Sequence, residues 1–154
     1  MTSPLQALPD EGETVLNPLG GPLTIKVHGS ETGDALSAFV STPAPGEGPP
    51  LHTHTREDEL MYFLEGRFRT MLDGTLRDAP RGSMIFIPKG APHTWQNTGT
   101  ETGRLLFVFT PGSPGMEEFF RRFAELPPEA FPTLAYEAGM EIVGPPLSES
   151  DPLP

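Results

Sequence analysis

The chain has 154 residues, no cysteine and a formal net charge of −11 at pH 7, which suits one domain and excludes thiol catalysis, disulfides and cysteine-ligated zinc. The acidic balance leaves no basic footprint for nucleic acid or for an anionic membrane surface, so neither is expected as a partner. No apolar run approaches the roughly 20 residues of a membrane span, and the first residues lack the pattern of a secretion signal, so we expect a cytoplasmic protein.

Short apolar segments separated by glycine and proline predict an all-β domain over residues 22–112. Strands are expected at residues 22–28, 34–41, 51–55, 59–65, 67–72, 75–78, 84–87, 93–97 and 104–110, with 84–87 buried. Residues 1–21 are rich in proline and glycine. They are expected to form an irregular arm across the domain or a partner subunit, with a flexible terminus as the alternative.

The pattern becomes helical after residue 112. Ser113 suits an N-cap and Pro114 the first helical position. Apolar residues then follow helical spacing at Met116, Phe119, Phe120, Phe123 and Leu126. This helix is expected to dock on its own domain or at a dimer interface, with a membrane or regulatory helix as the alternative. A second short helix is expected at 132–138, so that 113–143 form a helical extension and 144–154 a flexible tail.

Three of the four histidines point to a metal site. His52 and His54 are one residue apart in an expected strand, so their side chains share a face with Cα atoms roughly 6.5–7 Å apart. The polar residues 55–58 can reverse the chain and bring Glu59 back beside this pair, and His93 comes from a distant strand. An isolated surface pair of histidines is the alternative. Imidazole and carboxylate ligands together favour iron, manganese, nickel, copper, cobalt or zinc over calcium or magnesium.

Two glycine-bounded motifs contain these residues. The first has Gly46, His52, His54, Glu59 and Gly66, and the second has Gly82, Pro88, Gly90, His93 and Asn97. In content, order and separation, both motifs resemble those of the cupin superfamily, over about residues 22–110. The resemblance implies a jelly-roll barrel, also called a double-stranded β-helix, with one divalent transition metal bound by His52, His54, Glu59 and His93. It also implies a homodimer.

Other residues are expected to shape the site. Glu59 can ligate the metal and also take a proton from a substrate, which makes it the catalytic candidate. An apolar cavity suited to a planar small molecule is expected, lined by Met61, Phe63, Phe86 and Trp95. Trp95 could instead belong to the barrel core. His28 lies outside both motifs and is expected at the surface or a sheet edge, and Asn97 is expected to satisfy backbone groups in a turn.

Further features resemble the quercetin 2,3-dioxygenase-like single-domain cupins. They are the run from His52 to Gly66, the Glu-Glu-Phe-Phe segment at 117–120 and the closing segment at 139–147. The resemblance implies oxidative cleavage of a flavonol or a related enol, with Glu59 deprotonating the substrate hydroxyl. Two other classes stay open: a metal-dependent isomerase or lyase acting on a small polar substrate, and a non-catalytic small-molecule-binding cupin.

Overall fold

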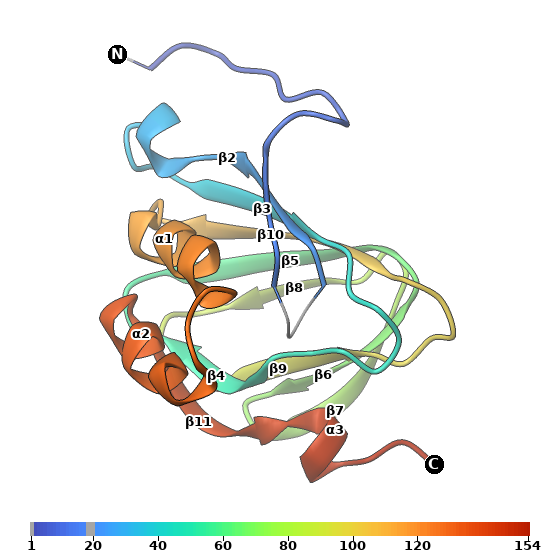
Figure 1. Ribbon diagram of the computed structural model, residues 1–154. Coiled ribbons are helices and arrows are strands. Elements are labelled where there is room, and N and C mark those ends of the chain that lie inside the picture. Colours follow the sequence, from blue (N-terminus) through green and yellow to red (C-terminus); the bar gives the residue numbers. More distant parts are fainter. Residues whose placement is uncertain (1, 18–20) are drawn as a thin grey trace.

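Two antiparallel sheets face each other across the core, and short helices lie along one side of them (Figure 1). This computed structural model describes residues 2–17 and 21–154, so residues 1 and 18–20 of the expected N-terminal arm lie outside the described residues. The predicted architecture, an all-β barrel with short C-terminal helices, is confirmed. In the described residues, no helix is both long and apolar enough to cross a membrane.

The two sheets are built from strands that are far apart in sequence. The six-stranded sheet has the order β1 (Glu13–Val15), β2 (Leu23–Val27), β3 (Ser37–Ser41), β10 (Arg104–Thr110), β5 (Asp58–Glu65) and β8 (Met84–Ile87). The five-stranded sheet has the order β11 (Met140–Pro146), β4 (Pro50–His54), β9 (His93–Asn97), β6 (Arg67–Leu72) and β7 (Thr75–Pro80). The Asp73-Gly74 turn between β6 and β7 has positive φ at both residues, as a tight hairpin requires.

The core lies between the sheets, where alternate residues of each strand point inward. Across β10 and β5 of the six-stranded sheet, Phe109 pairs with Glu59, Phe107 with Met61 and Leu105 with Phe63. Phe39 of β3 pairs with Phe107, and their rings stack with centroids 4.9 Å apart. Glu59 is therefore the end of an otherwise apolar inward row on β5.

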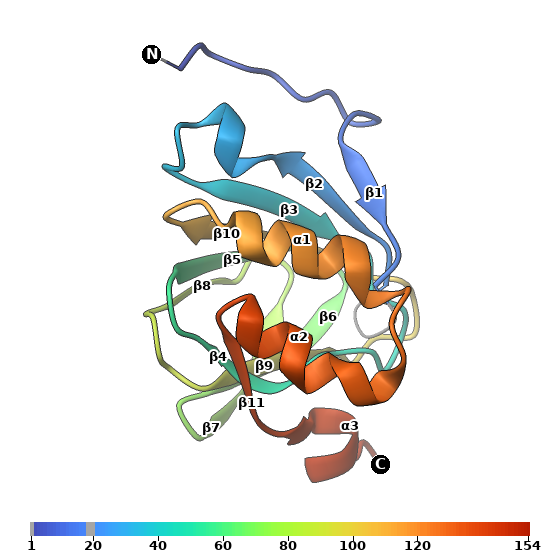
Figure 2. The same cartoon turned by 60° about the vertical axis from the view of Figure 1, so that its left-hand side comes forward.

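The helices cover one side of the barrel, with α1 (Pro114–Phe123) next to α2 (Phe131–Glu137) (Figure 2). The Ser113 side chain caps α1 by accepting a hydrogen bond from the backbone N–H of Met116, and Phe119 and Phe120 are buried against the barrel. The expectation that the amphipathic helix docks on its own domain is confirmed. Two 3₁₀ turns, η1 (Gly29–Glu31) and η2 (Pro128–Ala130), complete the helical segments before α3 (Leu147–Ser150).

Strand β8 differs from expectation. Residues 84–87 are an edge strand paired with β5, not a buried one. Because residues alternate along a strand, Met84 and Phe86 face outward and are 60% and 61% exposed, whereas Ile87 is buried. The prediction that Phe86 lines the cavity is wrong for the same reason.

Both ends of the chain are more regular than the sequence predicts. Part of the N-terminal arm forms β1, which pairs with β2 at the edge of the six-stranded sheet. Instead of a flexible tail from residue 144, the chain forms β11 and then α3, whose Leu147 is 2% exposed. Strand β11 pairs Met140 with His54 and Ile142 with His52, so the C-terminal strand braces the histidine strand. The two prolines at 145–146 concealed this strand in the sequence.

Candidate metal centre

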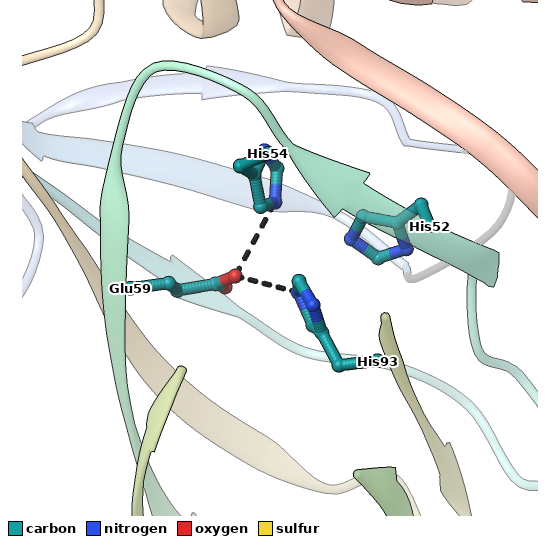
Figure 3. Close-up of side chains that lie close together, drawn as sticks. All are labelled: His52, His54, Glu59 and His93. Carbon is teal, nitrogen blue, oxygen red and sulfur yellow. Dashed lines mark hydrogen bonds and ion pairs between the residues drawn. The ribbon is translucent and has the colours of Figure 1, made fainter. Parts of the chain in front are cut away.

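Four side chains from three strands converge inside the barrel (Figure 3). Strand β4 carries His52 and His54, β9 of the same sheet places His93 directly opposite His52, and β5 of the other sheet supplies Glu59. The predicted meeting of these four residues is confirmed. Their candidate ligand atoms all lie within 4.8 Å of one another.

The cluster is shielded from solvent. The exposed fractions are 6% for His52, 4% for His54, 5% for Glu59 and 2% for His93. Glu59 Oε2 lies 2.9 Å from Nε2 of His93 and 3.3 Å from Nε2 of His54. A buried group of this kind needs a compensating charge or metal, because burying isolated charges is costly.

Backbone carbonyls fix which ring nitrogen carries a hydrogen in His52 and in His93. His52 Nδ1–H donates to the carbonyl of Pro50 at 2.7 Å, and His93 Nδ1–H donates to the carbonyl of Ala91 at 2.9 Å. A carbonyl oxygen only accepts, so in a neutral ring the lone pair sits on Nε2. Metal-binding histidines are oriented in this way by a hydrogen bond from their other ring nitrogen. Buried Nδ1 of His54 has no hydrogen-bond partner among the described residues.

The pKa shifts of Glu59, His52 and His93 show which of these side chains is charged. Burial raises the pKa of Glu59, but the hydrogen bonds from His54 and His93 outweigh it and hold that pKa far below its ordinary value. Burial beside His93 and His54 holds the pKa of His52 well below its ordinary value. Burial also lowers the pKa of His93, yet contact with the Glu59 carboxylate leaves it raised overall. Without a metal, Glu59 is therefore anionic, His52 is neutral and His93 favours the protonated form, so His93 would have to lose a proton to act as a ligand.

An apolar cavity of about 60 Å³ adjoins this cluster. Its polar end is His52, His54 and Glu59. Aromatic and other apolar side chains from β9, β10, β11, α1 and α2 form most of the rest: Trp95, Phe107, Phe109, Met116, Phe119, Phe120, Phe123, Phe131, Met140 and Ile142. The ring of Phe109 lies 4.8 Å from that of His54 in an edge-on contact, so the apolar wall begins at a candidate ligand.

The predicted wall residues have different positions in the structure. Trp95 lines the cavity, as expected. Met61 and Phe63 point inward but are packed in the core at 1% and 0% exposure, beside the cavity and outside its lining. Sequence reasoning missed the wall formed by Phe107, Phe109 and the helices. Helical spacing had marked the phenylalanines of α1 as buried, but it could not show what they face.

Two peripheral predictions can also be placed. Asn97 Nδ2 donates to the carbonyls of Pro43 and Glu101, and its Oδ1 accepts from the N–H of Gly99. This confirms its role in satisfying backbone groups. His28 lies at the end of β2, partly buried between Glu13 and Glu31.

A protein-family model matches the part of the chain that contains the metal cluster. Residues 39–109, which include all four clustered side chains, match the family model described as a cupin domain. The chain contains a cupin domain. The resemblance noted from the two motifs is thereby confirmed.

Relatives of known name match this cupin domain over part of their length. Protein SchB of Streptomyces halstedii is 34% identical over 85 residues, covering 54% of this chain and 62% of SchB. The tetracenomycin polyketide synthase protein TcmJ of Streptomyces glaucescens is 30% identical, covering 48% of this chain and 50% of TcmJ. Quercetin 2,3-dioxygenase of Bacillus subtilis is 30% identical, covering 47% of this chain and 22% of that protein. The matched segments thus span 62% of SchB and half of TcmJ, less than two thirds of either protein.

Solved structures share the fold at low sequence identity. KdgF from a Halomonas species superposes with a TM-score of 0.65 and 20% identity, covering 74% of this chain and 99% of that chain. The polyketide cyclase RemF from Streptomyces resistomycificus superposes with a TM-score of 0.59 and 22% identity, covering 74% of this chain and 82% of that chain. These likenesses support the cupin fold of this chain.

Proposed function

We propose that this protein is a metal-dependent enzyme that cleaves an enolisable aromatic substrate with dioxygen. The observation that carries the proposal is the buried three-histidine, one-glutamate cluster opening onto an aromatic-walled cavity. Similarity to quercetin 2,3-dioxygenase of Bacillus subtilis supports the reaction class.

The four donors fit a divalent transition metal held by His52, His54 and His93 through nitrogen and by Glu59 through oxygen. Bound there, such a metal supplies Lewis-acid polarisation of an enol oxygen and, if redox-active, electrons for the reaction with dioxygen.

Glu59 would accept a proton from the substrate. Glu59 lines the cavity, and its Oε2 lies 3.3 Å from His54 Nε2 and 2.9 Å from His93 Nε2, so an enol hydroxyl placed beside this carboxylate would donate its proton to it. Before a metal binds, hydrogen bonds from His54 and His93 hold the pKa of Glu59 low, so the carboxylate is anionic and able to accept a proton. The aromatic walls exclude water and strengthen the electrostatic interactions at this end.

Substrate size constrains the proposal. A cavity of about 60 Å³ is smaller than the roughly 150 Å³ that takes up a single benzene ring. A substrate or probe with even one aromatic ring therefore enters only if wall side chains move, and a multi-ring substrate needs a larger movement. Phe123 and Phe131 are partly exposed lining residues with ring centroids 4.7 Å apart, so they form the natural mouth of the cavity.

Oxygen uptake with a panel of flavonols tests the proposal directly. Protein reconstituted with each first-row divalent metal should consume dioxygen with at least one flavonol, and His93→Ala should abolish the uptake. Phe123→Ala, which widens the mouth, should raise kcat/KM for the bulkier flavonols relative to the smaller ones. A metal-loaded protein that turns over none of the panel with any of these metals would remove the dioxygenase proposal.

The second candidate is an isomerase or lyase that moves a proton without dioxygen. The small cavity volume favours it, because a compact substrate fits without rearrangement. Similarity to the polyketide synthase protein TcmJ also supports chemistry on enolisable carbonyl compounds. Product formation at the same rate under strict exclusion of dioxygen would favour this candidate over the first.

A further inference from the structure

Trp95 occupies a defined place beside the metal cluster. It follows His93 by two residues on β9, so both side chains point to the same face, with Cα atoms roughly 6.5–7 Å apart. Its ring packs edge-on against Phe68 at 5.9 Å, and the residue is 7% exposed. Trp95 therefore forms a packed section of the wall of the same cavity that His52, His54 and Glu59 line.

The indole N–H of Trp95 has no acceptor within the part of the chain that the structure describes. Nε1 makes no hydrogen bond to the described residues, and they do not enclose it completely. The N–H thus keeps a little accessible surface on a residue that is otherwise buried and borders the cavity. Buried tryptophans normally satisfy this donor within the protein, so an N–H that keeps accessible surface is left to bond water or a ligand.

Other polar side chains in the cavity lining are already occupied. His52, His54 and Glu59 belong to the metal cluster, and Asn17 and Ser41 take part in interactions of their own. Among the described lining residues, Trp95 is the remaining side-chain donor. A phenylalanine would fill the wall equally well without leaving a donor unpaired.

Resting on the proposed function, we infer that Trp95 Nε1–H donates a hydrogen bond to a second oxygen of the substrate and so sets its orientation. The ligand class is a planar enol whose chelating oxygens face the cluster and whose acceptor oxygen, a ring ether or carbonyl, lies across the ring. Trp95 is on this account a specificity-determining residue that touches the substrate.

The single tryptophan gives the inference a clean spectroscopic test. Protein labelled with nitrogen-15 and loaded with zinc, which is diamagnetic, should show one indole N–H resonance. Two one-ring enolic chelators serve as probes: 3-hydroxy-4-pyranone, which has a ring oxygen across from its carbonyl, and tropolone, which has none. The pyranone should move the indole resonance downfield, as hydrogen bonding does, and tropolone should not.

Calorimetry with Trp95→Phe provides the second measurement. The variant keeps an aromatic wall and should bind the pyranone roughly three- to tenfold more weakly, the size expected of one neutral hydrogen bond. Its affinity for tropolone should be unchanged. Comparing variant with wild type for each probe cancels the difference in chelating strength. Phe123→Leu is the control, because a change of wall shape should affect both probes alike.

The outcomes separate the two proposals. If both probes bind the zinc protein but the pyranone leaves the indole resonance in place and Trp95→Phe binds it normally, the role of Trp95 is overturned and the proposed function stands. If neither probe binds the zinc-loaded protein, the enol-binding function fails and the inference fails with it.

Discussion

The molecule contains two histidine–carboxylate clusters that have opposite characters. The barrel cluster, defined above, consists of His52, His54, Glu59 and His93. The arm cluster joins the N-terminal strand to α1 and consists of His28, Glu13, Glu31 and Arg121. Both place imidazole nitrogens about 3 Å from carboxylate oxygens, yet only the barrel cluster has the features of a metal site.

The difference lies in what surrounds the ring nitrogens. His28 uses both of them on carboxylates, with Nε2 3.1 Å from Glu13 and Nδ1 3.1 Å from Glu31. Burial lowers the pKa of His28, but these two hydrogen bonds outweigh it and leave the pKa raised, so His28 favours the imidazolium form. In the barrel cluster, backbone carbonyls take Nδ1–H of His52 and His93 and leave Nε2 for a metal. A histidine whose Nδ1–H donates to a backbone carbonyl keeps Nε2 available as a metal ligand. A histidine with a carboxylate at each ring nitrogen forms ion pairs instead.

Removing one histidine from each cluster should give the largest contrast. His93→Ala takes away a ligand that no neighbouring side chain can replace, and we expect metal affinity to fall at least roughly 100-fold, beyond the range for residues that merely orient ligands. His28→Ala should leave the metal content of purified protein unchanged. Elemental analysis and calorimetric metal titration measure both. Stoichiometric metal retained by His93→Ala and by His52→Ala would place the ligands elsewhere.

Chelation should affect stability through the barrel cluster alone. At a free metal concentration 100 times the Kd, metal binding adds about 2.7 kcal/mol to the free energy of unfolding. For a domain of this size that corresponds to a Tm shift of roughly 5–10 °C. Adding a chelator to wild-type protein should therefore lower Tm by that amount.

Variants of the two clusters provide the controls. His28→Ala should show the same chelator-induced shift as wild type, and His93→Ala should show almost none. Equal shifts in all three proteins would mean that the chelator acts at some site other than the barrel cluster.

The barrel cluster could be predicted from sequence because its spacing is local. Strand alternation alone puts His52 and His54 on one face, and a short turn returns Glu59 beside them. Only His93 requires the fold: it was expected from a distant strand, and the structure places it on β9 opposite His52. The strands with turns between them were predictable for the same reason, since each depends on a few neighbouring residues.

The cavity wall and the arm cluster were not predictable because they depend on contacts between distant segments. Helix α1 is held by Glu117, whose buried Oε1 accepts from the N–H of Gly29 and the hydroxyl of Ser37, 88 and 80 residues away. No local pattern encodes that pairing or the exposure of β8. The homodimer, the cytoplasmic location and the absence of nucleic-acid and membrane partners stay predictions.

The smallest expected effect comes from breaking the arm cluster with Glu13→Gln. The hydrogen bond from Arg121, followed by that from His28, lowers the pKa of Glu13 from 4.5 to about 2. A carboxylate with a lowered pKa stabilises the fold above the unfolded pKa, and this contribution disappears as pH falls from 4.5 towards 2. The raised pKa of His28 acts in the opposite sense, since its contribution is present below pH 6.5 and declines as pH rises through the higher folded pKa.

The arm cluster therefore works best at mildly acidic pH, where Glu13 is ionised and His28 is protonated. The Glu13 side chain is 39% exposed, so screening by solvent limits the effect to about 0.5–1 kcal/mol. Chemical unfolding should show that difference between wild type and Glu13→Gln near pH 5–6, a smaller one at pH 8 and almost none at pH 2, with metal content unchanged at neutral pH. Glu118→Gln, which removes only a surface contact within α1, is the matched control and should have less effect. A difference between wild type and Glu13→Gln that persisted at pH 2 would show that packing, and not charge, joins the N-terminal strand to the helix.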